Sequence, residues 1–188
     1  MQLARRFRNV LLHRIAAQRI RIHGDYQLHE VLYTGKDFII IDFEGPRWRP
    51  LADRRIKRSP LRDVASMIRS FEEAADSALS PAPAARGRAP GIVRPEDVTI
   101  LEPWAWTWHR WVSATFLRSY LQHIDGEPLL PPSREDRQLL LDLFILERAF
   151  VALHRELTDP DQWTGNPLRS ILRHLESRGQ ATGSAPSH

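Results

Sequence analysis

The chain of 188 residues contains no cysteine, so disulfide bonds and thiolate metal sites are excluded. Long apolar runs are also absent, and no stretch approaches the roughly 18 residues that a membrane-spanning helix needs. The basic residues 1–6 lack the continuous apolar segment of a secretory signal peptide. These absences predict a soluble cytoplasmic protein with no membrane partner.

Lysine is scarce, because almost all of the positive charge is arginine and only Lys36 and Lys57 are lysines. The net charge of +4 is modest, but arginine gathers at residues 5–8 and 54–58. Such clusters fit a solvated surface, a nucleic-acid footprint, or local attraction of phosphate groups near an active site. A nucleic-acid interface also needs an aromatic-interleaved or groove-entering element, which the sequence does not show. We therefore expect no nucleic-acid partner.

Hydrophobic periodicity predicts a mainly α (α+β) chain, with helices at residues 3–20, 60–78, 103–123, 134–157 and 167–176. Residues 31–33 and 38–43 flank a turn and predict a β-hairpin, whose second strand is apolar throughout and is expected to be covered on both faces. The aromatic residues of 103–123 are expected in the core. Residues 80–95 predict a loop, and residues 177–188 a disordered tail.

Carboxylates stand at three points around this hairpin. His23-Gly24-Asp25 places one on a tight loop, Glu30 lies at the mouth of the hairpin, and Asp42 lies at the far end of its second strand. A hairpin returns Asp42 to the neighbourhood of Asp25. Phosphoryl transfer to a hydroxyl group needs one carboxylate to take or orient the hydroxyl proton, and others to hold Mg²⁺ at the phosphates. The pattern therefore predicts this chemistry.

The order His23-Gly24-Asp25, then Glu30, then Asp42-Phe43-Glu44 resembles the aminoglycoside phosphotransferase-like kinase superfamily. More narrowly the chain looks like the maltokinases, which are often fused to trehalose synthase, over about residues 10–175. The narrower likeness rests on the extended stretches Arg21-Ile22-His23-Gly24-Asp25-Tyr26 and Ile41-Asp42-Phe43-Glu44-Gly45. It also rests on Val31-Leu32, Arg54-Arg55-x-Lys57-Arg58-Ser59-Pro60-Leu61-Arg62-Asp63-Val64-Ala65, Leu146-Glu147-Arg148-Ala149, and Glu156-Leu157 through Trp163 to Pro167-Leu168-x-x-Ile171-Leu172.

The resemblance implies ATP and Mg²⁺ as cofactors and maltose as the sugar that is phosphorylated. By position, Asp25 would be the catalytic base, with His23 bracing its loop, and Asp42 would be the principal metal and nucleotide-site ligand. Glu30 would hold the second metal position, with a solvated hairpin-edge carboxylate as the alternative. Asp63 would support the catalytic loop through its backbone, or act only as a first-turn helix residue. Glu156 would contact sugar hydroxyls, or be a solvated helix-end carboxylate.

Six positions depart from the family pattern: Gln27, His29, Glu30, Val151, Ala152 and Arg155. These changes leave the acceptor open, so an aminoglycoside or choline kinase stays an alternative. The resemblance also implies a lobe before the catalytic loop that covers adenine and supplies a phosphate-binding lysine, yet Asp25 comes early and no glycine-rich loop precedes it. We therefore expect residues 1–176 to be a C-terminal lobe with little activity alone. A non-catalytic domain that pairs with a separate N-terminal lobe or with trehalose synthase is the alternative, and either predicts exposed apolar surface.

Overall fold

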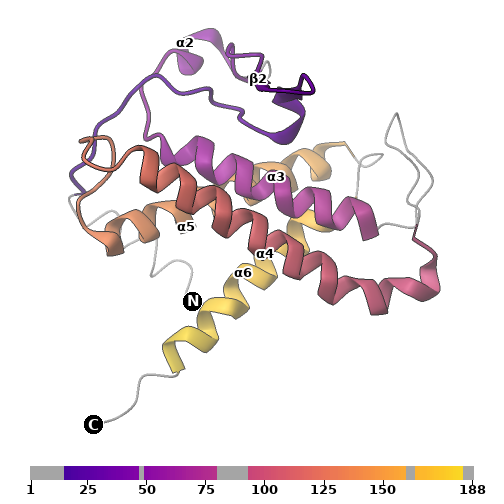
Figure 1. The fold of residues 1–188 in the computed structure, drawn as a ribbon. Coiled ribbons are helices and arrows are strands. Elements are labelled where there is room, and N and C mark those ends of the chain that lie inside the picture. The colour runs from indigo at the N-terminus through magenta and orange to yellow at the C-terminus, as the bar shows by residue number, and fades with distance from the viewer. Residues whose placement is uncertain (1–14, 47–48, 80–92, 160–163, 184–188) are drawn as a thin grey trace.

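The computed structural model describes residues 15–46, 49–79, 93–159 and 164–183, with side chains up to residue 176, and every structural statement below concerns these residues. The helical elements are η1 (Leu28–Glu30), α2 (Leu51–Arg54), α3 (Leu61–Leu79), η3 (Pro95–Asp97), α4 (Val98–His123), α5 (Arg134–Thr158) and α6 (Asn166–Gly183). The strands β1 (Val31–Tyr33) and β2 (Phe38–Ile40) form one antiparallel pair. The prediction of a mainly helical chain with a small β-hairpin is confirmed (Figure 1).

Helix α3 is the centre of the packing, because it contacts both α4 and α5, and α5 in turn contacts α6. Most of its buried apolar residues lie three or four positions from another one, which places them on a continuous face. They are Leu61, Val64, Ala65, Met67, Phe71 and Ala75, joined by Leu146 and Ala149 of α5 and Ile171 of α6. The hairpin and α2 lie together on one side of α3, and α4 runs along another side (Figure 1).

The hairpin pairs Val31 with Ile40 and Tyr33 with Phe38 around a turn that Thr34 and Asp37 close through their backbones, 2.9 Å apart. Its second strand ends at Ile40 rather than at residue 43. The expected cover on both faces is wrong: Phe38 is 71% exposed and Ile39 is 50% exposed. The reason is that the described sheet has only two strands, and no described element packs over their apolar side chains.

The first predicted helix is also wrong where it can be checked. Residues 15–19 have no regular structure, and Ile20 forms an isolated antiparallel bridge with Arg58, with N···O distances of 3.0 and 2.9 Å. The alternation of Ile20-Arg21-Ile22 favours this extended backbone, because β-branched residues pack well in strands. Residues 1–14 of that prediction lie outside the described part of the chain.

Helix α4 begins at Val98 and contains Pro103, so it starts ahead of the predicted residue 103. Trp104, Trp108 and Trp111 are exposed, which corrects the expectation that they lie in the core. Their spacing puts them on one face of α4. Phe71 of α3 still meets Trp108 edge to face, with ring centres 6.4 Å apart, and Phe116 in the same way at 5.7 Å. The aromatic pattern therefore predicted a helix face correctly, but α3 covers only part of it.

The predicted ends of the later elements need two corrections. Helix α6 continues to Gly183, so the expected disordered tail is wrong for residues 177–183, while residues 184–188 lie outside the described part. Of the predicted loop at 80–95, residues 80–92 also lie outside it, and Pro95 already belongs to η3. Among the helices that the structure describes, none is both long and apolar enough to span a bilayer.

Candidate active site

Helix α3 holds both ends of the loop that carries Asp25. The Asp63 carboxylate accepts hydrogen bonds from the backbone N–H groups of His23, at 2.7 Å, and Gly24, at 2.9 Å. Ser70, about two helical turns further on, accepts the Leu28 N–H at 2.9 Å. Because residues seven apart share a helix face, α3 presents both acceptors to the loop. The backbone contact expected of Asp63 is therefore present, and its part in catalysis stays a prediction.

The environment of Asp63 opposes its charge. Burial raises the pKa of the Asp63 carboxyl, and the two backbone hydrogen bonds counteract that rise only in part. Burial also raises the pKa of Tyr26, and the negative charge of Asp63 adds to this rise. Each of the two N–H donors needs an acceptor, and the ionised carboxylate supplies one oxygen to each donor. The loop geometry thus depends on an anion that is buried at some cost.

His23 connects the Asp25 loop to the segment that carries Asp42. Its Nδ1 accepts the Asp25 N–H at 3.3 Å, so the proton of the neutral ring lies on Nε2, which donates to the Ile41 carbonyl at 2.7 Å. The ring also packs against Phe43, with centres 5.0 Å apart. One buried imidazole therefore braces the residue on either side of Asp42 and the backbone of Asp25.

The backbone around Asp42 has an unusual shape. Asp42 has φ of 56°, and no other non-glycine residue in the described ranges has a positive φ. Gly45 follows with φ of 73°, and a side chain there would place its Cβ 3.3 Å from the carbonyl oxygen of His23. Left-handed backbone of this kind is uncommon outside glycine and often occurs at functional sites. The turn brings the Asp42 segment against the loop that carries Asp25.

Asp25 has a charged partner that the sequence did not reveal. Its Oδ1 accepts a hydrogen bond from Arg148 Nη2 of α5 at 2.7 Å and another from Gln27 Nε2 at 2.7 Å. Arg148 belongs to the stretch Leu146-Glu147-Arg148-Ala149 that supports the family resemblance, but spacing alone could not assign it to Asp25. Gln27, one of the departures from the family pattern, thus contacts the proposed catalytic base.

The other two candidate carboxylates have their own surroundings. Glu30 is buried, and its Oε1 lies 3.1 Å from Nε2 of His29, which rules out the solvated alternative. Glu156 accepts hydrogen bonds from the N–H of Thr164 at 3.3 Å and of Gly165 at 3.1 Å, just before α6 begins. It therefore ties the end of α5 to the start of α6, and its contact with sugar stays a prediction.

The donor set suits magnesium in part. Among the described residues, no three His, Asp or Glu side chains gather as a ready metal cluster. Magnesium usually takes one or two protein carboxylates and completes its shell with water and phosphate oxygens. The Asp42 side chain is exposed and makes no hydrogen bond or ion pair with a described residue, so it fits such a ligand. Glu30, buried beside His29, fits less well.

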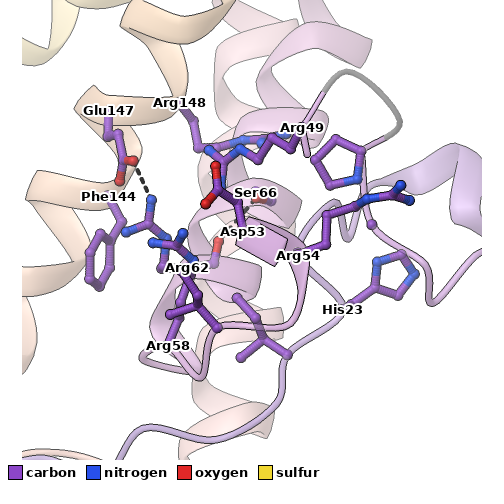
Figure 2. A pocket seen from close by; sticks show the side chains of 15 residues that line it. His23, Arg49, Asp53, Arg54, Arg58, Arg62, Ser66, Phe144, Glu147 and Arg148 are labelled. Atoms are coloured by element: carbon purple, nitrogen blue, oxygen red, sulfur yellow. Dashed lines mark hydrogen bonds and ion pairs between the residues drawn. The ribbon is translucent and has the colours of Figure 1, made fainter. Parts of the chain in front are cut away.

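A hollow that is open to solvent lies next to the loop that carries Asp25 (Figure 2). His23 and Gly24 form part of its wall, and α3 and α5 contribute Ser66 and Phe144. Its charged lining is dominated by five arginines: Arg49, Arg54, Arg58, Arg62 and Arg148. Arg62 makes an ion pair with Glu147 across the hollow and lies over the Phe144 ring, 5.0 Å from its centre. The expected attraction of anions near the loop thus has a structural basis.

No family model matches the sequence. Among solved structures, the chain is similar to a glucosamine kinase in complex with glucosamine, ADP and inorganic phosphate, with a TM-score of 0.63 and 18% sequence identity. The match covers 88% of this chain. The chain has a sugar-kinase-like fold. It spans 37% of the length of that glucosamine kinase, and identity at this level establishes the fold alone.

Proposed function

We propose that this sugar-kinase-like lobe takes part in ATP-dependent phosphorylation of a sugar hydroxyl, with Asp25 as the catalytic base and Asp42 as the metal ligand. The observation that carries the proposal is the His23 side chain, which hydrogen-bonds the backbone of Asp25 at 3.3 Å and of Ile41, the neighbour of Asp42, at 2.7 Å. Phosphoryl transfer needs little more from the protein than positioned carboxylates and charge stabilisation.

Each residue has a defined part in this reaction. Asp25 accepts the proton of the sugar hydroxyl while the hydroxyl oxygen attacks the γ-phosphorus of ATP, and ADP leaves. Arg148 and Gln27 hold the Asp25 carboxylate in one orientation through 2.7 Å hydrogen bonds. A magnesium ion held by Asp42, with Glu30 as a second carboxylate, would neutralise charge on the phosphates. Asp63 fixes the backbone of the loop that positions Asp25.

Maltose is the acceptor that we propose first, giving maltose 1-phosphate, because the motifs from Arg21 to Ala65 resemble the maltokinases. Glucosamine is a second candidate, because a glucosamine kinase shares the fold. The departures at Val151, Ala152 and Arg155 leave the choice between these sugars to experiment. A sugar panel that also contains an aminoglycoside and choline tests the remaining acceptors.

We further propose that the lobe works beside a nucleotide-binding lobe. The chain matches 37% of the glucosamine kinase length, and the hairpin leaves Tyr33 and Phe38 exposed at 64 and 71%. Large exposed apolar patches commonly mark interfaces. A scaffold that pairs with trehalose synthase through the same patch is the alternative, and it predicts binding without phosphoryl transfer.

The test compares the chain alone with the same chain joined behind a nucleotide-binding lobe of the superfamily. Folding is checked by circular dichroism and ADP binding by calorimetry, so that a failed fusion is recognised before the assay. Sugar phosphate is then measured by mass spectrometry, with maltose and glucosamine as acceptors. We expect product from the joined protein and little from the chain alone. Full maltose-dependent ADP release by the chain alone would contradict the need for a second lobe.

A further inference from the structure

The hollow beside the catalytic loop carries an excess of positive charge. Its wall contains five arginines against two carboxylates, Asp53 and Glu147, which leaves an excess of three positive charges. The arginines come from three separate places: the segment around α2, the first turn of α3, and α5. Figure 2 shows the arginines gathered around this one hollow. A fold that brings like charges together in this way is stabilised when an anion joins them.

The cations face one another closely enough to interact. Burial lowers the pKa of the Arg49 guanidinium, and the positive charges of Arg62, Arg58 and Arg148 lower it further, while Glu147 opposes them. Repulsion within the hollow thus exceeds what its carboxylates compensate. This electrostatic strain is relieved by a bound anion, whereas it persists in the empty hollow.

Two arginines of the hollow, Arg54 and Arg58, are not committed to carboxylates. The other two that can be compared are paired, Arg62 with Glu147 and Arg148 with Asp25. The side chain of Arg58, in contrast, makes no hydrogen bond or ion pair with a described residue, and only its backbone bridges to Ile20. Arg54 donates to the Glu44 carbonyl at 3.3 Å, and its Nε is buried without a partner among the described residues. Donors of this kind remain available to a ligand.

We infer that this hollow binds a phosphomonoester dianion of a small molecule. The planar guanidinium fork matches phosphate oxygens in pairs, and every basic residue of the hollow is arginine rather than lysine. The hollow is open to solvent, so the phosphate group of a phosphomonoester can lie among the arginines while the rest of the molecule extends outward. The proposal concerns binding alone and does not depend on phosphoryl transfer by Asp25.

Isothermal titration calorimetry of the full chain tests the site, with inorganic phosphate and glucose 1-phosphate as probes and acetate as the carboxylate control. No nucleotide or sugar acceptor is present, so a negative result here is distinct from failure of the kinase proposal. We expect saturable binding of one phosphate probe per chain and none of acetate. Tighter binding of glucose 1-phosphate than of inorganic phosphate identifies a phosphate ester as the ligand. Equal affinities for the two probes identify the phosphate group alone as sufficient for binding. Absence of saturable binding of both probes overturns the proposal.

Neighbouring arginines provide matched variants. Arg54→Gln and Arg58→Gln each remove a donor of the hollow, and we expect the dissociation constant to rise about tenfold, as loss of a charged hydrogen bond predicts. Arg55→Gln removes the same charge from an exposed position outside the hollow and should leave the constant within about twofold. Circular dichroism identifies a variant that fails to fold, in which case the other one decides. Equal losses in all three variants would show general charge attraction and overturn the site.

Discussion

The carboxylate of Asp25 and the guanidinium of Arg148 meet at 2.7 Å, although the two residues lie 123 positions apart in the chain. The contact joins the loop that carries Asp25 to α5, and both side chains are about four-fifths buried, at 21 and 18% exposure. A partly buried charged pair of this kind contributes more than a surface ion pair.

A double-mutant cycle measures this contact. Asp25→Asn, Arg148→Gln and the double variant are unfolded with urea, and we expect a coupling free energy of about 1–2 kcal/mol. Arg155→Gln, at an exposed position of the same helix, should show coupling below about 0.5 kcal/mol with Asp25→Asn. Coupling that is no larger for Arg148 than for Arg155 would mean that the pair does not form in solution.

Asp63 offers a second test, because its two oxygens receive the N–H groups of His23 and Gly24. Asp63→Asn keeps one acceptor but turns an amide NH₂ toward the other donor, so we expect a loss of about 2 kcal/mol in the free energy of unfolding. Asp125→Asn, at an exposed site, should change it by less than about 0.5 kcal/mol. Hydrogen exchange at the Gly24 amide should accelerate in Asp63→Asn alone. Unchanged exchange there would contradict the bracing role.

The contrast between Asp63 and Arg148 shows what the sequence could predict. Asp63 follows a recognisable motif, and its backbone contact with the loop was expected from the family resemblance. Arg148 lies in an equally recognisable stretch, but which carboxylate it meets depends on how α5 packs against α3, and helical spacing does not specify that rotation. The same limit explains Trp104 and Trp111: their spacing indicated a helix face, but burial depends on a neighbour that the described residues do not provide.

The hairpin illustrates a different limit. Phe38 and Ile39 were expected to be covered because apolar β-branched runs are typical of buried strands. The composition was a sound guide to the strand but carries no information on whether the covering element belongs to the same chain. The apolar spacing of residues 3–20 predicted a helix that ends at Ile20, and the period-two pattern of Ile20-Arg21-Ile22 predicted that the helix does not continue. The structure has extended backbone already at Ile20.

The exposed hairpin leads to a prediction on association. Phe38 is 71% exposed beside Tyr33, and their ring centres lie 5.1 Å apart. We expect the chain to self-associate with rising concentration, and Phe38→Ser to weaken this association about tenfold without lowering the unfolding free energy, because little of the side chain is buried. Sedimentation velocity over a concentration series measures it. Ile100→Ser, an equally exposed change on α4, is the control, and an equal effect there would argue against the hairpin as the interface.

A buried charged network between α3 and α6 predicts the response to acid. Glu72 accepts hydrogen bonds from Arg69, Arg173 at 2.8 Å and Ser170 at 2.7 Å, and it is 8% exposed. Burial raises the pKa of Glu72, but the charges of Arg69 and Arg173 together with these hydrogen bonds outweigh it, so the pKa lies below the ordinary value of 4.5. The ionised group therefore stabilises the fold above that value, and this stabilisation is lost as the pH falls through the lowered pKa.

Glu72→Gln tests that sign. At pH 7 we expect the variant to be about 3 kcal/mol less stable, since it leaves buried arginine charge uncompensated. The difference from the unaltered protein should shrink as the pH falls below 4.5. Urea titrations from pH 3 to pH 7 follow it, with the exposed Glu96→Gln as control. A difference that stays constant down to pH 3 would contradict the lowered pKa.

The most direct measurement of the proposed chemistry is transfer of the γ-phosphate of ATP to maltose or glucosamine by the chain joined to a nucleotide-binding lobe. Asp25→Asn should reduce the rate by about 10² to 10⁴, as loss of a general base predicts. Asp42→Asn should also reduce the rate of transfer, and ADP binding by this variant is measured in parallel. Asp37→Asn, in the exposed hairpin turn, should leave the rate unchanged. Sugar phosphate that forms at the same rate in Asp25→Asn would contradict the assignment of this loop as the catalytic site.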